Sequence, residues 1–221
     1  MKKKYSATAM FCLVLGWVVT TGHVQAQSGI TIDASQQITN FVFTDGSGLQ
    51  DNTHLILGEE NLYKPVYSGA YSFGYSYLLD FGLFFRVNAG MRNAGATMVY
   101  DATNYKWEFR YLQGKLGLGY ALDLGLVNPY LAVSGYYAYL LKANQRINNE
   151  DFDIIDSESI RKTDYGLNIP LGVRIDASDY ISVYTEVSYV VGLQNIETAT
   201  NGQVANNVGY MATLGLLLTI E

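Results

Sequence analysis

The chain has 221 residues, of which 49% are apolar and 15% charged, and its formal net charge is −6. This acidic balance argues against a nucleic-acid partner, because nucleic-acid binding requires concentrated Lys and Arg. The length fits one domain, and 19 tyrosines, 9 phenylalanines and 22 glycines beside only 3 prolines favour strands.

The amino terminus has the layout of a secretory signal peptide. Three lysines at positions 2–4 precede an apolar run from Ala7 to Val19, and small residues stand at the cleavage positions that end at Ala26. The run is shorter than the roughly 20 apolar residues that a membrane-spanning helix needs. We predict a signal peptide over residues 1–26 and an outer-membrane β-barrel domain over 27–221, with 11 basic and 20 acidic residues and a net charge of about −9.

The mature chain contains eight stretches in which every second residue is apolar. The clearest runs from Thr163 to Asp176, where Tyr165 and Leu167 share one face and Asp164 and Asn168 share the other. A period of two is that of a strand whose faces meet different environments. The predicted strands are Ile30–Asp45, Val66–Leu79, Leu83–Tyr100, Tyr105–Leu122, Val127–Arg146, Lys162–Asp176, Ile181–Ile196 and Asn206–Ile220.

The connections between these strands alternate in length. Outer-membrane β-barrels show this alternation, with short turns at the periplasmic rim and longer loops at the outer rim. An even number of strands returns both termini to the periplasmic rim. The tight turns are 80–82, 123–126 and 177–180, and the others are 46–65, 101–104, 147–161 and 197–205, of which only 101–104 is short.

Alternation alone does not say which face points inward, because a soluble lipocalin-like barrel is apolar inside and polar outside. The strand Val66–Leu79 favours the opposite arrangement, since it pairs an aromatic face with a face of serines and a glycine. Small residues fit a narrow lumen, and a wall nearly free of charge suits lipid. The predicted lipid-facing belt includes Tyr71, Phe85, Leu131, Leu171, Val187 and Leu216.

These patterns predict an all-β fold: a monomeric, eight-stranded antiparallel up-and-down transmembrane β-barrel in the Gram-negative outer membrane, surrounded by outer-membrane lipids. Side chains fill a lumen of this size, so diffusion of solutes is not expected. Buried charges of both signs should form an internal salt-bridge network rather than a proton or ion path. The lumen candidates are Arg86, Arg92, Lys115, Asp164, Arg174 and Glu186.

The strand Tyr105–Leu122 changes its pattern along its length. Trp107, Phe109 and Tyr111 occupy odd positions, whereas the leucines from Leu112 onward occupy even ones. A β-bulge near Tyr111 would produce such a change. The other explanation is that the first half extends beyond the membrane, where neither face meets lipid.

The loop 147–161 holds five carboxylates, which are candidates for a calcium site. They lack the spacing and the turn glycine of an EF-hand, so a solvated acidic loop is expected. We therefore predict no metal-binding residue. The five are Glu150, Asp151, Asp153, Asp156 and Glu158.

Catalysis would require an activated nucleophile and a base. The only histidine after residue 26 is His54, which shares a polar loop with Ser47 and Asp51. Nearness in sequence is poor evidence for a triad, so no enzyme activity, catalytic residue or cofactor is predicted. Four tyrosines, which a binding surface could also use, are expected in the interfacial girdle: Tyr63, Tyr67, Tyr136 and Tyr137.

Five segments of the chain form a recognisable set in their order and spacing: Asn128–Leu131, Tyr136–Ala143, Thr163–Leu167, Glu186–Tyr189 and Gly192–Ile196. Together they resemble the PorT-type outer-membrane β-barrel family of Bacteroidota. The resemblance implies an eight-stranded outer-membrane barrel without catalytic residues, and the family's named member is linked to a secretion system. In one departure from many outer-membrane barrels, this chain does not end in an aromatic residue.

We therefore expect a non-enzymatic outer-membrane barrel with surface-exposed loops, whose role is structural or associated with the envelope or secretion. Its expected partners are envelope or secretion-system proteins. Two alternatives remain: a barrel that binds surface ligands or adheres, and a soluble lipocalin-like carrier of small apolar ligands.

Overall fold

The computed structural model describes residues 27–44, 63–198 and 204–220. The predicted signal peptide, and the loop that holds Ser47, Asp51 and His54, lie outside these residues. In the described part of the chain, no helix is long and apolar enough to cross a membrane.

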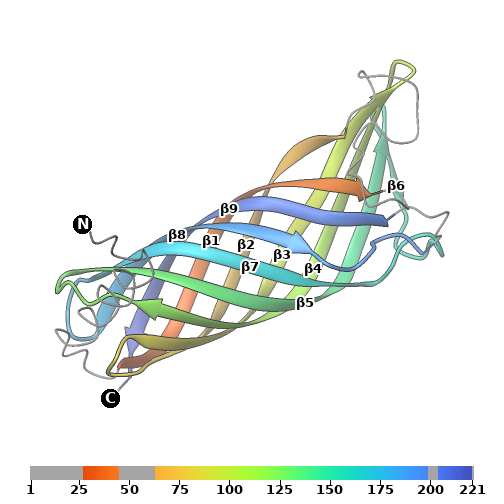
Figure 1. Ribbon diagram of the computed structural model, residues 1–221. Coiled ribbons are helices and arrows are strands. Elements are labelled where there is room, and N and C mark those ends of the chain that lie inside the picture. The colour runs from red at the N-terminus through yellow and green to blue at the C-terminus, as the bar shows by residue number, and fades with distance from the viewer. Residues whose placement is uncertain (1–26, 45–62, 199–203, 221) are drawn as a thin grey trace, which may run out of the picture.

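Nine antiparallel strands occur in the described segments, and eight of them close into a ring in the order β1, β2, β3, β4, β5, β7, β8, β9 (Figure 1). The short strand β6 pairs only with the end of β5 and stands outside the ring. All eight predicted strands are confirmed, and the largest difference is at β8, which ends at Gly192 rather than Ile196. The bounds are β1 Gln27–Thr44, β2 Lys64–Leu78, β3 Leu83–Tyr100, β4 Thr103–Ala121, β5 Val127–Ile147, β6 Glu150–Asp153, β7 Thr163–Asp176, β8 Ile181–Gly192 and β9 Val204–Thr219.

The two rims of the barrel differ in height. Gly29 near the start of β1 pairs with Thr219 at the end of β9, so both strand ends lie at the rim with the tight turns. At the opposite rim, β3, β4, β5 and β6 extend beyond the other strands (Figure 1). We call this part, residues 95–108 and 143–153, the projecting sheet. It includes the strand β6, where the sequence predicted only an acidic loop.

The outer wall is apolar and much of the inner face is polar. All six predicted belt residues are exposed, with Leu171 at 64% and Tyr71 at 61%. Inside the ring, Asn88, Asp164 and Glu186 are each at most 5% exposed. This arrangement suits strands in lipid and is the reverse of what the soluble lipocalin-like alternative predicted.

The strand β4 keeps one alternation throughout its length. Phe109 and Tyr111, 3% and 1% exposed, face the lumen as Gln113 does. A bulge does lie near Tyr111, as one of the two explanations had it, but its extra residue is Leu141 of β5, opposite Arg110 and Tyr111. The first half of β4 extends beyond the other strands as part of the projecting sheet.

Two apolar clusters close the lumen, one at each end. The prediction of a polar lumen is confirmed for its middle and for part of the end at the tight turns, and apolar side chains with aromatic rings occupy space at both ends. The lower cluster, at the rim with the tight turns, is Leu78, Phe84, Ala121, Tyr130, Ala132, Tyr184 and Leu217. The upper cluster is Phe41, Phe43, Ala94, Ala96, Phe109, Tyr111, Tyr136, Ala138, Leu140, Ala143, Val190, Ile196, Ala205 and Met211.

Candidate functional site

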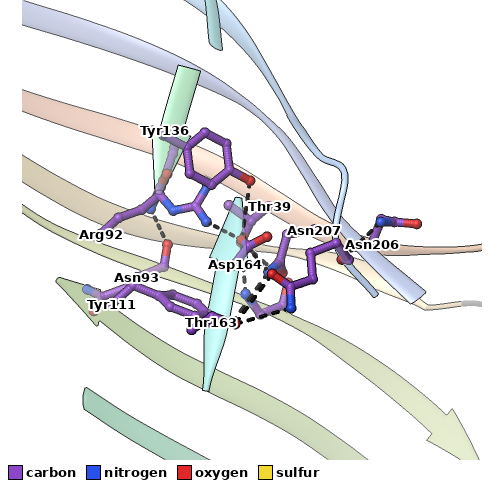
Figure 2. A network of polar contacts seen from close by, with 12 residues as sticks. Thr39, Arg92, Asn93, Tyr111, Tyr136, Thr163, Asp164, Asn206 and Asn207 are labelled. Atoms are coloured by element: carbon purple, nitrogen blue, oxygen red, sulfur yellow. Dashed lines mark hydrogen bonds and ion pairs between the residues drawn. The ribbon is translucent and has the colours of Figure 1, made fainter. Parts of the chain in front are cut away.

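Asp164 is the centre of the upper polar layer of the lumen. Its side chain on β7 is fully buried, and its Oδ2 accepts hydrogen bonds from Arg92 Nη2 at 2.8 Å and Asn207 Nδ2 at 3.0 Å (Figure 2). The hydroxyl of Tyr136 donates to the same oxygen at 3.2 Å. The Arg92 guanidinium also lies over the rings of Tyr136 and Tyr111, 4.7 and 5.5 Å from their centroids. One carboxylate therefore joins β3, β5, β7 and β9.

Glu186 organises a second layer nearer the rim with the tight turns. Its Oε2 accepts hydrogen bonds from Arg86 Nη1 at 3.1 Å and from the hydroxyl of Tyr130 at 2.7 Å. The guanidinium of Arg86 lies 4.7 Å from the ring centroid of Tyr184. The cation is thus held by a carboxylate and by aromatic faces, which compensates for its removal from water.

Asp33 forms a third group, which the sequence analysis missed. Its Oδ2 accepts hydrogen bonds from Ser72 at 2.7 Å and Asn88 at 3.0 Å, and Asn88 also donates to Thr31. In the sequence, only the alternation of Asp33 with the outward-facing Ile32 indicates that Asp33 points inward. Lys115 stands beside Asn88 in the β3–β4 register and forms no ion pair within 4 Å among the described residues.

Arg174 lies near the tight-turn rim and not in the central network. Its Nε pairs with Asp176 on the same strand at 2.8 Å. The Asp176 carboxylate also accepts hydrogen bonds from Asn128 and Ser182 on the neighbouring strands. Five of the six predicted lumen residues therefore form ion pairs, as the salt-bridge prediction required.

This lumen is filled. A cavity of about 20 Å³ beside Arg86, Tyr130 and Tyr184 has room for about one water molecule. The polar layers lie between the two apolar clusters, so their charges stabilise the wall instead of lining an open path.

Two carboxylates of the projecting sheet, Asp151 and Glu108, form ion pairs. Arg146 donates from Nε and Nη2 to Asp151 at 2.6 and 2.9 Å, and this contact lowers the pKa of the Asp151 carboxyl. Lys106 pairs with Glu108 at 2.5 Å. Nowhere in the described chain do three or more acidic, His or Cys side chains gather in a way that could hold a metal ion.

The four tyrosines predicted for the girdle divide into two pairs. Tyr67 and Tyr137 face outward, with 75% and 59% of their surface exposed. For the other two the prediction is wrong, because Tyr136 is buried in the lumen and Tyr63 packs inside against Trp107, with ring centroids 5.5 Å apart. Tyr136 shares an alternating face with the small residues of β5, which was the signal for its inward position.

A closed ring with an apolar outer wall and a polar interior is the architecture of an integral outer-membrane β-barrel. Solved barrels are similar in fold. Neisserial surface protein A is 14% identical, with 89% of this chain and 100% of that chain covered and a TM-score of 0.48. AlkL, determined in lipid bilayers, is 14% identical, with 100% and 97% covered and a TM-score of 0.49.

The amino-terminal barrel domain of OprF from Pseudomonas aeruginosa is 12% identical, with 84% and 97% covered and a TM-score of 0.43. No protein-family model matches this chain, and no curated protein does.

Proposed function

We propose that this protein is a non-enzymatic outer-membrane anchor that presents its projecting sheet outside the cell as a docking element of an envelope or secretion assembly. One observation carries the proposal: an ordered four-stranded sheet extends from a barrel whose lumen is closed. A closed lumen leaves the surfaces of the barrel for function, and among the described residues the projecting sheet is the largest departure from a plain ring.

The projecting sheet has the properties of a preformed contact surface. Its strands are paired to their ends, from Tyr100 with Thr103 to Ile147 with Glu150. A partner would therefore meet an ordered surface, which lowers the entropic cost of binding. The resemblance to the PorT-type family supports a secretion-associated partner.

The orientation belongs to the same proposal, with the termini in the periplasm and the projecting sheet outside. In outer-membrane barrels, short turns face the periplasm. Cysteine is absent after residue 12, so Asn149→Cys and Leu124→Cys can each be labelled selectively in intact cells with an impermeant maleimide. Labelling of the Asn149 variant alone is expected, and labelling of the Leu124 variant alone would reverse the orientation.

The absence of catalysis is also proposed. Both histidines of the chain, His23 and His54, lie outside the described residues. Lipid A and phospholipid turnover should be the same in wild type and in the His54→Ala variant. Loss of a wild-type turnover in that variant would overturn the non-enzymatic assignment.

A shortened variant tests the docking role. Ala96 pairs with Trp107, and Asn144 pairs with Asp153, so each pair can be joined by an Asn-Gly turn that replaces the residues between them. The shortened protein should still show a compact band in detergent that shifts on boiling, but should not restore secretion in a deletion strain. A control with an Asn-Gly turn at 178–179 on the opposite rim should restore it.

Three outcomes are distinguishable. Loss of secretion with normal folding supports the proposal. Normal secretion with lost attachment to surfaces would favour the adhesive alternative, which would use the same sheet. Full function of the shortened protein in both assays would exclude this sheet as the functional element.

A further inference from the structure

We infer that Arg110 and Lys142 form a binding site on the outer wall for the phosphorylated headgroup of an outer-leaflet lipid. The site is separate from the docking role and shares with it only the orientation, in which the projecting sheet lies outside the cell.

The bulge in β5 brings the two cations together. Below the bulge, Tyr136, Ala138 and Leu140 point into the lumen, and above it Ala143 does so. The extra residue shifts the alternation by one, so that Lys142 faces outward instead of following Leu140 inward. Bulges commonly redirect a side chain in this way.

Arg110 is the direct cross-strand partner of Lys142. Like charges in such a pair repel and destabilise a sheet. Neither cation has a carboxylate within 4 Å among the described residues, because the nearby Glu108 pairs with Lys106. An anion bound between the two cations would remove this repulsion.

The cations border a hollow in the wall of about 220 Å³, lined also by Ser68, Asn93, Asn144 and Glu108, whose carboxylate pairs with Lys106. Arg110 Nε already donates to Asn93 Oδ1 at 3.2 Å, which orients the guanidinium along the wall. The guanidinium can donate two parallel hydrogen bonds to a phosphate, and the Lys142 ammonium supplies a second positive charge. The side-chain amides of Asn93 and Asn144 can donate to further phosphate oxygens, whereas the Ser68 hydroxyl donates to the carbonyl of Asn93 at 3.1 Å.

The hollow exists because β2 and β3 are not paired along part of their length. Their register breaks between Pro65 and Ala70 of β2. Side chains of β1 occupy the gap from inside: Gln37 donates to the carbonyl of Asn93, and Thr39 bonds to the backbone of Gly95. The gap is therefore sealed toward the lumen and open toward the outer wall.

The position of the site identifies its occupant as a lipid. From the site toward the rim with the tight turns, the outward residues of β4 and β5 are apolar, beginning with Leu112 and Leu141, which are 50% and 44% exposed. From the site toward the tip of the projecting sheet, outward residues such as Lys106 and Arg146 are charged. The cations thus stand where the apolar belt ends, at the depth of the headgroups, so a phosphate held here leaves its acyl chains beside the leucines.

The test measures binding of lipid A that carries two phosphates to the folded protein in a neutral detergent, by native mass spectrometry. The variant Arg110→Gln with Lys142→Gln should bind roughly ten- to thirtyfold more weakly, since each cation near a membrane surface contributes to anionic-lipid binding. The variant Arg110→Lys with Lys142→Arg should bind like wild type. A boiled and unboiled gel confirms that each variant folds.

A matched control removes two positive charges at the same rim but from another wall, through Arg161→Gln with Lys162→Gln. Its affinity should stay within about twofold of wild type, and added salt should weaken wild-type binding. Equal affinity in the Arg110–Lys142 double variant and wild type would overturn the site. Equal binding of fully dephosphorylated lipid A, or displacement of lipid A by equimolar inorganic phosphate, would overturn a phosphorylated lipid as its ligand.

Discussion

Arg92 and Asp164 connect two strands that are not neighbours in the ring, because the guanidinium on β3 reaches across the lumen to the carboxylate on β7, 2.8 Å away. Both side chains are nearly inaccessible, at 3% and 0% exposure. A contact that spans the lumen fixes the shape of the barrel in a way that pairing along its wall alone does not.

Removing one member of this pair should therefore be costly. Asp164→Asn leaves the Arg92 cation buried without its counter-charge, so the free energy of unfolding in detergent should fall by about 3–5 kcal/mol. Urea titration followed by tryptophan fluorescence measures this loss. Replacing both residues with leucine should cost less than the two single changes summed, and equal costs for Asp164→Asn and the exposed Asp151→Asn would contradict the cross-lumen role.

Tyr130 packs against Gly172, and this contact predicts a second sensitive position. A Cβ at residue 172 would collide with the Tyr130 ring and would disturb its hydrogen bond to Glu186. Gly172→Ala should thus destabilise the protein by about 1–3 kcal/mol, measured by the same titration. Gly135→Ala is the control, because nothing lies within 4 Å of its added carbon, and an equal loss there would refute the explanation.

The sequence predicted the ring well because strands in lipid obey a strict period of two. One face must be apolar over the whole membrane thickness, so outward residues such as Leu171 and Val187 were identified from the pattern alone. Arg86, Arg92, Asp164 and Glu186 were placed inside because a charge on the lipid face is costly.

The prediction was less successful where the environment changes along a strand. Phe109 and Tyr111 look lipid-facing by hydrophobicity, yet they fill the upper end of the lumen while Arg110 faces outward. No local signal marks the height at which the membrane ends. The bulge at Leu141 and the strand β6 likewise depend on pairing between segments, which periodicity within one segment does not contain.

The two apolar clusters predict that the protein does not conduct. Wild type in planar bilayers should show no steady ohmic current, and liposomes that contain it should not swell in small sugars. The variant Phe41→Ala with Phe109→Ala, which removes two rings 5.6 Å apart from the upper cluster, should also remain closed, because the Asp164 layer and the lower cluster persist. A steady current from wild type would contradict the closed lumen.

The Arg146–Asp151 contact predicts a pH response of the projecting sheet. The hydrogen bond from Arg146 lowers the pKa of Asp151 in the folded state. The contact therefore stabilises the folded sheet above the unfolded-state pKa of about 3.9. This stabilisation is lost as the pH falls through the lower pKa of the folded state. An NMR titration of the Asp151 carboxyl carbon should show a midpoint below the ordinary range. Arg146→Gln should return it to that range, and an unchanged midpoint would exclude Arg146 as the cause.

The tip of the β3–β4 hairpin contains a residue that is poorly suited to its backbone. Asp101 and Ala102 form the two-residue turn, with φ of 47° and 59°, between the paired Tyr100 and Thr103. A turn with two positive φ angles prefers glycine at its second position, and an L-residue in this region costs about 1–2 kcal/mol.

Ala102→Gly removes this strain but gives the unfolded hairpin more freedom, which offsets about 0.4–1 kcal/mol of the gain. Slower amide exchange at Tyr100 and Thr103 is therefore expected, by roughly two- to fivefold for the net gain of about 0.5–1 kcal/mol. The contrasting change Ala96→Gly, at a fully buried position within the same hairpin, should speed exchange, because glycine weakens a strand interior. Faster exchange in Ala102→Gly would show that the turn is not strained.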